Sequence, residues 1–391
     1  MTTDALSSPR VRSHNLGLIV RSVRDHGAIH RAQLAADLGL TRTSVTRLVG
    51  DLVDSGILVN EAPRSKPGRG RPATPVRFNP RTWALLGIDA RVDHTEVMLT
   101  DLEGVPLASE VFGFDLPVAP EDFVARVVDV GEELVAAQGR RLLAVGVGLP
   151  ARFSVGFERV ARSDRFGWGE VDLIRRLQGR FGWDVPVGMR DISRAAALAN
   201  ARQPEMSTYT RILHLQLGMG LGMALTAGQE LDESLPPVWG AIEHAPLGDQ
   251  DVVCECGRRG CVDASIGFSR FRELTASVAQ GTVVGPTGIA EHMANVVDAL
   301  GQDDRSVAEA VNRLTRLLAH VLGTVSAIVA PDALTLGGYP LLLGRDFMEA
   351  LKAQLTEELP GPPPLLESPL GDGASLKGSA MLALDAYVES L

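Results

Sequence analysis

The stretch CECGRRGCVD, residues 254–263, contains every cysteine of this 391-residue chain. Three thiols cannot all pair as disulfides, and so few cysteines are not typical of a secreted, disulfide-stapled scaffold. Thiolates this close together can instead converge on one tetrahedral metal ion. The spacing therefore predicts a shared metal site, and the alternative is a reduced, metal-free cysteine cluster.

The composition of the chain is that of a folded protein with two or three domains, because 391 residues exceed one ordinary core. The chain is 45% hydrophobic and 22% charged. Its N-terminal stretch MTTDALSSPRVRSHN lacks the apolar core of a signal peptide. The longest apolar run, residues 317–330, is interrupted by His320 and is shorter than the ~20 residues that span a bilayer. We expect a cytoplasmic protein without a membrane partner.

Charge is distributed unevenly along the chain. Residues 1–80 contain 12 Lys/Arg and 6 Asp/Glu, whereas residues 81–391 contain 26 and 42. A head with a net charge of +6 therefore precedes a body with a net charge of −16. This asymmetry predicts that the head, and not the body, meets a polyanion such as double-stranded DNA.

Residues 1–63 have the pattern of a winged helix-turn-helix domain. Apolar residues recur at helical spacing within residues 16–23, 31–38 and 45–52. Gly39 supplies the turn before the third helix, Thr41 can cap that helix, and ILVNE, residues 57–61, predicts a strand. The polar face of the third helix provides the candidate DNA contacts Arg42, Thr43, Ser44, Thr46 and Arg47. The alternative is a small helical bundle with a solvated polar face.

Residues 64–76 are expected to form a basic linker. The stretch RSKPGRGRPATP, residues 64–75, carries four Lys/Arg on a Gly/Pro-rich backbone that cannot build a packed element. In extended form it can enter a narrow A·T minor groove, where negative potential attracts inserted arginine. The candidate contacts there are Arg69, Gly70, Arg71 and Pro72. A plain flexible linker is the alternative, and we expect the segment to serve both purposes.

From residue 85 onward, strands alternate with helices, which predicts an α/β architecture. Residues 85–104 predict a strand, a turn and a strand, and residues 142–150 predict a buried strand. Residues 211–228 predict a hairpin with glycines at positions 218, 220 and 222. A helix at 307–330 and a strand ending at Gly337–Gly338 follow. Each glycine-rich turn alone is weak evidence for a phosphate-binding fold.

The order of these motifs resembles that of the ROK family (repressors, open reading frames, kinases), in particular its transcription-factor branch, over nearly the whole chain. The most specific match is His244 followed by Cys254-x-Cys256-Gly-x-x-Gly-Cys261-x-Asp263, which is similar to the family's GH…CxCGxxGCxE zinc signature. Asp89, the stretch LGMGLG and Gly337–Gly338 are weaker matches in the expected order.

The resemblance implies a two-lobed, actin-like, sugar-kinase-type body, with a winged helix-turn-helix added in the regulators. Residues 77–190 are then expected to form lobe 1, completed by a C-terminal helix at about 374–391, and residues 191–373 to form lobe 2. The zinc loop belongs to lobe 2. The ligand set His244, Cys254, Cys256 and Cys261 suits structural Zn²⁺ with no open coordination position, and Gly257 and Gly260 allow the tight turns.

Kinases of this family carry a D-x-G-G-T-K loop after the first strand. This chain has Asp89–His94 there, so the diglycine, the threonine and the lysine are missing. Arg91 and Val92 place side chains where a phosphate should approach bare backbone, and Asp93 adds negative charge. We therefore expect that the chain is not an enzyme.

The sugar site departs from the family pattern as well. Asp191 matches the family's catalytic base, or alternatively only caps a helix, while Arg190 replaces an asparagine. In GAIEH, Ala241 stands where the family has a sugar-binding glutamate, and Glu243 stands at a glycine. The candidate effector residues are Arg190, Asp191, Glu243, His244 and Asp263. Each unmatched hydroxyl costs ~1–3 kcal/mol, so plain glucose should bind weakly. Arg190 beside His244 favours an anionic ligand such as a sugar phosphate.

These observations predict a DNA-binding transcriptional regulator, in the first place a repressor, of carbohydrate-related genes. Its degenerate kinase-like body would act as sensor and dimerisation module, in a homodimer or homotetramer. Two alternatives remain: an active ATP-dependent sugar kinase with an added DNA-binding domain, and a ligand-independent architectural DNA-binding protein.

Overall fold

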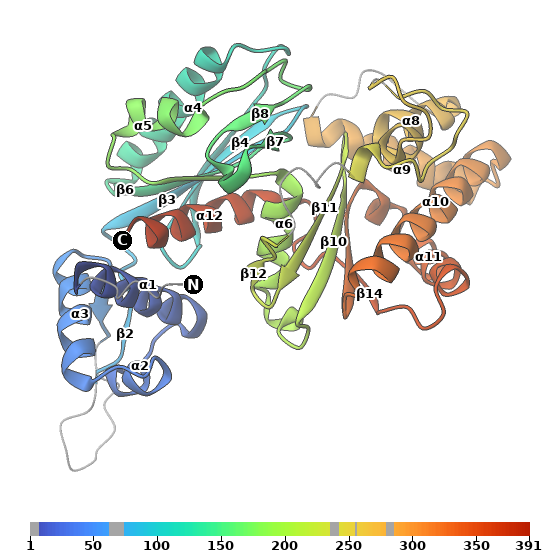
Figure 1. Ribbon diagram of the computed structural model, residues 1–391. Helices are drawn as coiled ribbons and strands as arrows, with labels where there is room; N and C mark the ends of the chain where they lie inside the picture. Colours follow the sequence, from blue (N-terminus) through green and yellow to red (C-terminus); the bar gives the residue numbers. More distant parts are fainter. Residues whose placement is uncertain (1–7, 62–73, 235–241, 255, 279–284) are drawn as a thin grey trace.

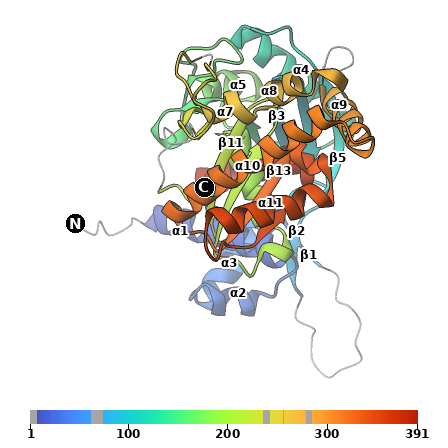
Figure 2. The same cartoon turned by 90° about the vertical axis from the view of Figure 1, so that its right-hand side faces the viewer.

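The computed structural model describes residues 8–61, 74–234, 242–254, 256–278 and 285–391. A small N-terminal head lies below a two-lobed α/β body (Figure 1). The turned view places the head below the body again (Figure 2). None of the helices within these ranges combines the length and the apolar content that a bilayer span requires.

The head consists of three helices and a two-stranded antiparallel sheet. Its elements are α1 (Ser8–His26), α2 (Arg31–Asp37), α3 (Arg42–Asp54), β1 (Leu58–Asn60) and β2 (Val76–Phe78). The three expected helices and the expected strand are confirmed, and the Thr41 hydroxyl caps α3 by accepting a hydrogen bond from Ser44 N at 3.1 Å. The second strand lies at the end of the range expected for the linker and the start of the range expected for lobe 1. Its partner β1 precedes the whole basic segment, so local sequence does not reveal the pairing.

Lobe 1 is built on a five-stranded sheet in the order β5-β4-β3-β6-β9. The strands are β3 (Trp83–Ala90), β4 (Thr95–Thr100), β5 (Pro106–Phe112), β6 (Arg141–Gly148) and β9 (Val187–Arg190). Helices α4 (Pro120–Gln138) and α5 (Leu173–Phe181) cover one face, and α12 (Ala374–Ser390) covers the other (Figure 1). A two-stranded excursion, β7 (Arg152–Phe153) and β8 (Val160–Arg162), extends between β6 and α5.

Lobe 2 has a second five-stranded sheet in the order β12-β11-β10-β13-β14. The strands are β10 (Arg211–Leu217), β11 (Leu221–Ala227), β12 (Glu230–Leu231), β13 (Ala333–Gly338) and β14 (Leu365–Glu367). Helix α6 (Ile192–Ala201) packs between this sheet and α12. The remaining helices, with α10 and α11 in front in Figure 2, are α7 (Val262–Ile266), α8 (Phe268–Leu274), α9 (Gly285–Gly301), α10 (Arg305–Val329) and α11 (Arg345–Glu358). The expected hairpin, long helix and glycine-ended strand are present.

Helix α12 joins the head to both lobes. Its C-terminal half contributes Ala383, Leu384 and Val388 to the core of the head, where they pack with side chains of α1 such as Ile19 and Val23. In Figure 1 the helix runs beneath the lobe-1 sheet with the C-terminus beside the head. The head is therefore part of the packed structure of lobe 1.

Glycines allow α12 to approach its neighbours backbone to backbone. A Cβ atom on Gly87 of β3 would stand 2.7 Å from the amide nitrogen of Ala380, and one on Gly146 of β6 would stand 2.6 Å from that of Ala383. A Cβ atom on Gly378 of α12 would overlap the carbonyl oxygen of Ala195 in α6. Side chains at these positions would hold α12 away from the sheet and from α6.

We expect Gly146→Ala to destabilise the protein by about 3 kcal/mol, because the methyl group meets backbone that cannot move aside. The matched control is Gly50→Ala in α3, where an added Cβ meets nothing within 4 Å. This control should gain roughly 0.5–1 kcal/mol, since alanine loses less conformational entropy than glycine in a helix. Urea unfolding of both variants gives the measurement. Equal stabilities for the two variants would show that the fold does not depend on close backbone contact between α12 and the lobe-1 sheet.

Candidate functional site

The cysteine loop of lobe 2 folds as two tight turns. Gly257 and Gly260 have φ values of +83° and +73°, a region that favours glycine because it lacks a Cβ atom. The amide of Cys254 donates to the carbonyl of Arg258 at 2.8 Å, and that of Gly260 donates to the carbonyl of Val252 at 3.0 Å. These bonds bend the chain back on itself and bring the cysteines together.

The four expected metal ligands converge. The ligand atoms of His244, Cys254, Cys256 and Cys261 all lie within 4.8 Å of one another. The Sγ atoms of Cys256 and Cys261 are 3.7 Å apart, and Nδ1 of His244 is 3.6 Å from Sγ of Cys254. A tetrahedral ion with bonds of ~2.3 Å to sulfur and ~2.0 Å to nitrogen separates its ligands by about 3.5–3.8 Å. The residues therefore fit Zn²⁺.

Deprotonation of the thiols favours the metal site, which should therefore form more readily at neutral and higher pH. Hydrogen bonds from Arg258 lower the pKa of the Cys256 thiol to about 7. Burial raises the pKa of the Cys261 thiol to about 12. A metal ion requires thiolates, so its binding must displace a proton from Cys261, and acidification opposes it.

Three carboxyl groups gather beside this loop. Burial raises the pKa of Glu243 to about 8, and the nearby Asp191 and Asp263 carboxylates add to the shift. Burial also raises the pKa of Asp191. Nε2 of His244 lies 3.9 Å from the Glu243 carboxylate, so one imidazole faces the thiols with Nδ1 and the carboxyl groups with Nε2. Four of the candidate effector residues, Asp191, Glu243, His244 and Asp263, thus lie together beside the cysteine loop.

The glycines of the β10–β11 hairpin border the same carboxyl groups. A Cβ atom on Gly222 would lie 3.5 Å from Asp191 Oδ1, and one on Gly220 would lie 3.8 Å from Asp263 Oδ1. Asp191 is also the N-cap of α6, because its carboxylate accepts from the amide of Ser193 at 2.8 Å. Asp191 therefore caps α6, as one of the two alternatives predicts, and its carboxylate also lies beside Glu243.

The contacts of two arginines differ from those that we expected from the sequence. Arg190 donates to Glu233 at 3.1 Å and stacks over the ring of Phe157 at 4.1 Å, contacts that do not include His244. Arg165, from the excursion after β8, lies 3.4 Å from Asp263 instead. Sequence reasoning missed Arg165, since 98 residues separate it from its partner. The GAIEH residue Ala241 lies outside the described residues.

An arginine fills the loop that follows the first strand of the body. Arg91 donates to the buried carboxylate of Asp89, to Asp372 and to the Ser375 hydroxyl, each at 2.9 Å. Ser375 in turn donates to Asp89 at 2.6 Å. The guanidinium ties the end of β3 to the start of α12. The Arg91 guanidinium, which stands where the kinase loop has none, is thus engaged by groups of the chain itself.

The polar face of α3 lies on the surface of the head. Arg42, Thr43, Thr46 and Arg47 are exposed, and Ser44 is half-buried. The Thr46 hydroxyl donates to the carbonyl of Arg42 at 2.8 Å within the same helix. The side chains of Arg42 and Arg47 are the cations that this face presents. The expected minor-groove contacts Arg69, Gly70, Arg71 and Pro72 lie outside the described residues.

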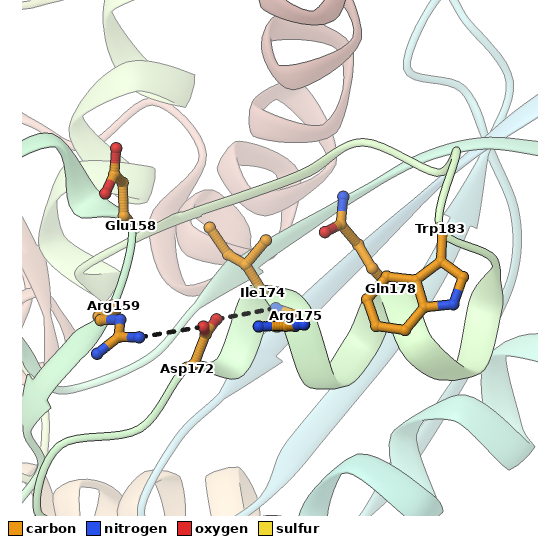
Figure 3. Close-up of a pocket in the computed structure, with 7 residues that line it drawn as sticks. All are labelled: Glu158, Arg159, Asp172, Ile174, Arg175, Gln178 and Trp183. Carbon is orange, nitrogen blue, oxygen red and sulfur yellow. Dashed lines mark hydrogen bonds and ion pairs between the residues drawn. The ribbon is translucent and has the colours of Figure 1, made fainter.

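A separate surface hollow of about 570 Å³ lies on lobe 1 beside α5. Figure 3 shows Asp172 between Arg159 and the first turn of α5, where it accepts from the amide of Arg175 at 3.1 Å. The hollow is open to solvent, and Trp183 stands at its edge with two thirds of its surface exposed. None of its lining residues belongs to the candidate site, so we assign it no part in the chemistry.

Comparison with characterised proteins identifies relatives of two kinds. The chain is 21% identical over 348 residues to the xylose repressor of Caldicellulosiruptor bescii, a match that covers 87% of this chain and 86% of that protein. It is 28% identical over 305 residues to the kanosamine kinase of Amycolatopsis mediterranei, covering 76% of this chain and 95% of the kinase.

Solved structures share the fold. A ROK family transcriptional regulator, described as a homolog of the E. coli MLC protein, superposes with a TM-score of 0.79 at 20% identity and covers 97% of this chain and 98% of that one. A ROK family glucokinase from Streptomyces griseus superposes with a TM-score of 0.62 at 21% identity and covers 77% and 99%. The expected fold, a two-lobed α/β body with a helical N-terminal region, is confirmed. The sequence profile of the ROK family matches residues 85–386, and the chain belongs to the ROK family.

Proposed function

We propose that this protein is a DNA-binding transcriptional regulator, a repressor of carbohydrate-related genes, whose ROK body senses a sugar. The observation that carries the proposal is the head itself: three helices and a two-stranded sheet built into the body through α12. The similarity to a xylose repressor over 87% of the chain supports the same function. The kanosamine kinase matches a smaller share of the chain, 76%.

The head would bind DNA through α3. Its arginines Arg42 and Arg47 are exposed on one helix, and residues 1–80 carry a net charge of +6. A helix with such side chains can enter the major groove, while the basic segment 64–75 would follow the backbone or the adjacent minor groove. Two copies of the chain would place two heads on an inverted repeat.

The body would hold an uncharged sugar near Asp191, Glu243 and Asp263. The expectation of a sugar phosphate depended on Arg190 next to His244, but Glu233 neutralises that guanidinium. The carboxyl groups of Asp191, Glu243 and Asp263 can instead form hydrogen bonds with the hydroxyl groups of an uncharged sugar. Zn²⁺ bound by His244 and the cysteines would hold the loop that carries Glu243, and would take no part in chemistry.

An active sugar kinase is the second candidate, favoured by the 28% identity to kanosamine kinase. A kinase needs a backbone cradle for the ATP phosphates. In this chain the Arg91 side chain occupies the corresponding loop and pairs with Asp89 and Asp372. We therefore propose that the body binds sugar without phosphorylating it. A protein that binds DNA and no sugar is the third candidate, and the sugar screen below separates it from the first.

Arg47→Ala should weaken binding to selected DNA about tenfold, because it removes an exposed cation from the proposed recognition helix. Fragmented genomic DNA selected on the wild-type protein supplies the probe, and gel shifts at several salt concentrations give the affinity. We expect the selected sites to contain inverted repeats with A·T-rich flanks, and Arg71→Ala to reduce the preference for those flanks.

The matched control is Arg316→Ala, which removes another exposed arginine, from α10 of lobe 2. Its affinity should equal that of the wild type. The proposed function is refuted if the wild-type protein selects no DNA. The assignment of α3 as the recognition helix is refuted if Arg47→Ala and Arg316→Ala bind the selected DNA with the same affinity.

Purified protein should contain one zinc ion per chain, and Cys256→Ser should release it and lower the thermal midpoint, because three ligands hold the ion less tightly than four. Arg259→Ala is the control: it alters the same loop but keeps all four ligands, so it should retain the ion. Elemental analysis of freshly purified, reduced protein gives the zinc content. A zinc-free wild type would refute the metal assignment.

We expect no transfer of phosphate from ATP to D-xylose or D-glucose in a coupled assay. In a thermal-shift screen D-xylose should raise the Tm, D-glucose should have little effect, and D-glucose 6-phosphate should have none, because Arg190 is already paired with Glu233. A Tm rise with D-glucose 6-phosphate alone would instead support an anionic ligand such as a sugar phosphate. Phosphate transfer that Asp191→Asn abolishes would establish the kinase.

A further inference from the structure

Four charged side chains meet where the head contacts the body. Arg24 lies in the last turn of α1, Asp385 in α12, Arg202 at the C-cap of α6 and Glu230 at the start of β12. They come from the head, from the helix that completes lobe 1, and from two elements of lobe 2. We name them the charge ring.

The charges of the ring alternate in sign. Arg24 donates to Glu230 at 2.9 Å and to Asp385 at 3.0 Å. Arg202 donates to the other oxygens of the same two carboxylates, at 2.8 Å in each case. Each carboxylate therefore bridges two guanidinium groups. Burial alone would raise the pKa of Glu230, but the attraction of Arg202 and Arg24 lowers it below its ordinary value.

The head is attached to the two lobes in different ways. Its apolar core includes side chains of α12 and of lobe-1 strands, among them Leu85, Leu143 and Leu384, and within the described residues it includes none from lobe 2. The head contacts lobe 2 through an ion pair between Arg24 and Glu230. Apolar packing holds one orientation, whereas an ion pair whose glutamate is half exposed can open at little cost.

One helix connects the charge ring to the candidate effector site. Helix α6 begins at Asp191, its N-cap, among the site carboxyl groups, and ends at Arg202, its C-cap, in the ring. Its ten residues span about 15 Å. Every residue from Ser193 to Ala201 is buried between the lobe-2 sheet and α12. A displacement at one end must therefore reach the other end, because a buried helix moves as a unit.

We propose that α6 and the charge ring couple the effector site to the restraint that lobe 2 places on the DNA-binding head. A ligand that shifts Asp191 moves Arg202, which strengthens or releases the bonds that Glu230 and Asp385 make with Arg24. The head keeps its packing on α12 and changes its restraint toward lobe 2. The regulatory meaning of this coupling rests on the proposed function, but the coupling itself exists without DNA.

Hydrogen exchange with a double-mutant cycle tests the coupling without a ligand. Asp191→Ala removes the cap of α6 and should speed amide exchange in residues 21–26 of α1 about fivefold or more. The same substitution in a Glu230→Gln background should have no further effect there, because the ring is already open. Should Asp191→Ala fail to fold, Ser193→Ala perturbs the same cap more mildly.

Asp25→Asn is the matched control. Asp25 also pairs with Arg24, at 2.7 Å, but it belongs to the head itself. In this background Asp191→Ala should keep its full effect on α1. Independent, additive effects of Asp191→Ala and Glu230→Gln on α1 exchange would overturn the coupling.

DNA binding gives the second measurement. With the genomic fragments selected above, Glu230→Gln should weaken affinity about fivefold, since a less restrained head must be ordered on binding, and Asp25→Asn should not. Unchanged affinity in Glu230→Gln would overturn the regulatory part of the proposal. A wild type that selects no DNA would refute the proposed function, and the exchange cycle would still decide the coupling.

Discussion

The structure depends on the close approach of α12 to the lobe-1 sheet and to α6. Gly87 and Gly146 remove side chains from the sheet surface, and Gly378 removes one from α12, so that backbone meets backbone. The helix then has one end at the loop after β3 and the other in the core of the head. Were α12 held even one methyl group farther away, the head would lose the surface on which it packs.

The body combines the fold of a kinase family with a different arrangement of charge. In the loop after β3, the positively charged guanidinium of Arg91 forms ion pairs with the carboxylates of Asp89 and Asp372. In lobe 2, the candidate metal ligands converge through two left-handed glycines, and three carboxyl groups lie beside them. One fold can hold sites of different function, because a few side chains set the chemistry of a site while packing sets the fold.

Apolar and ionic contacts have separate roles in holding the head. The core that the head shares with α12 is buried and fixes a single arrangement, since packed side chains do not deform continuously. The charge ring lies at the edge of that core, where the half-exposed Glu230 can exchange its partners with water while Arg202 is buried. Stable attachment on one side and adjustable attachment on the other is the arrangement that a switch requires.

Sequence alone determined the features that local chemistry specifies. Cysteine spacing and two glycines predict the metal loop because a few adjacent residues build it, and Thr41 predicts the start of α3 because a cap acts within one turn. Only the tertiary structure decided the partners of Arg190, Arg165 and Arg24. The Arg24 guanidinium meets Asp385 across 361 positions, and an arginine can pair with any carboxylate that folding brings near. Helical periodicity and turn chemistry contain no information about such distant encounters, so the site's charge balance and the coupling of the head arise from packing.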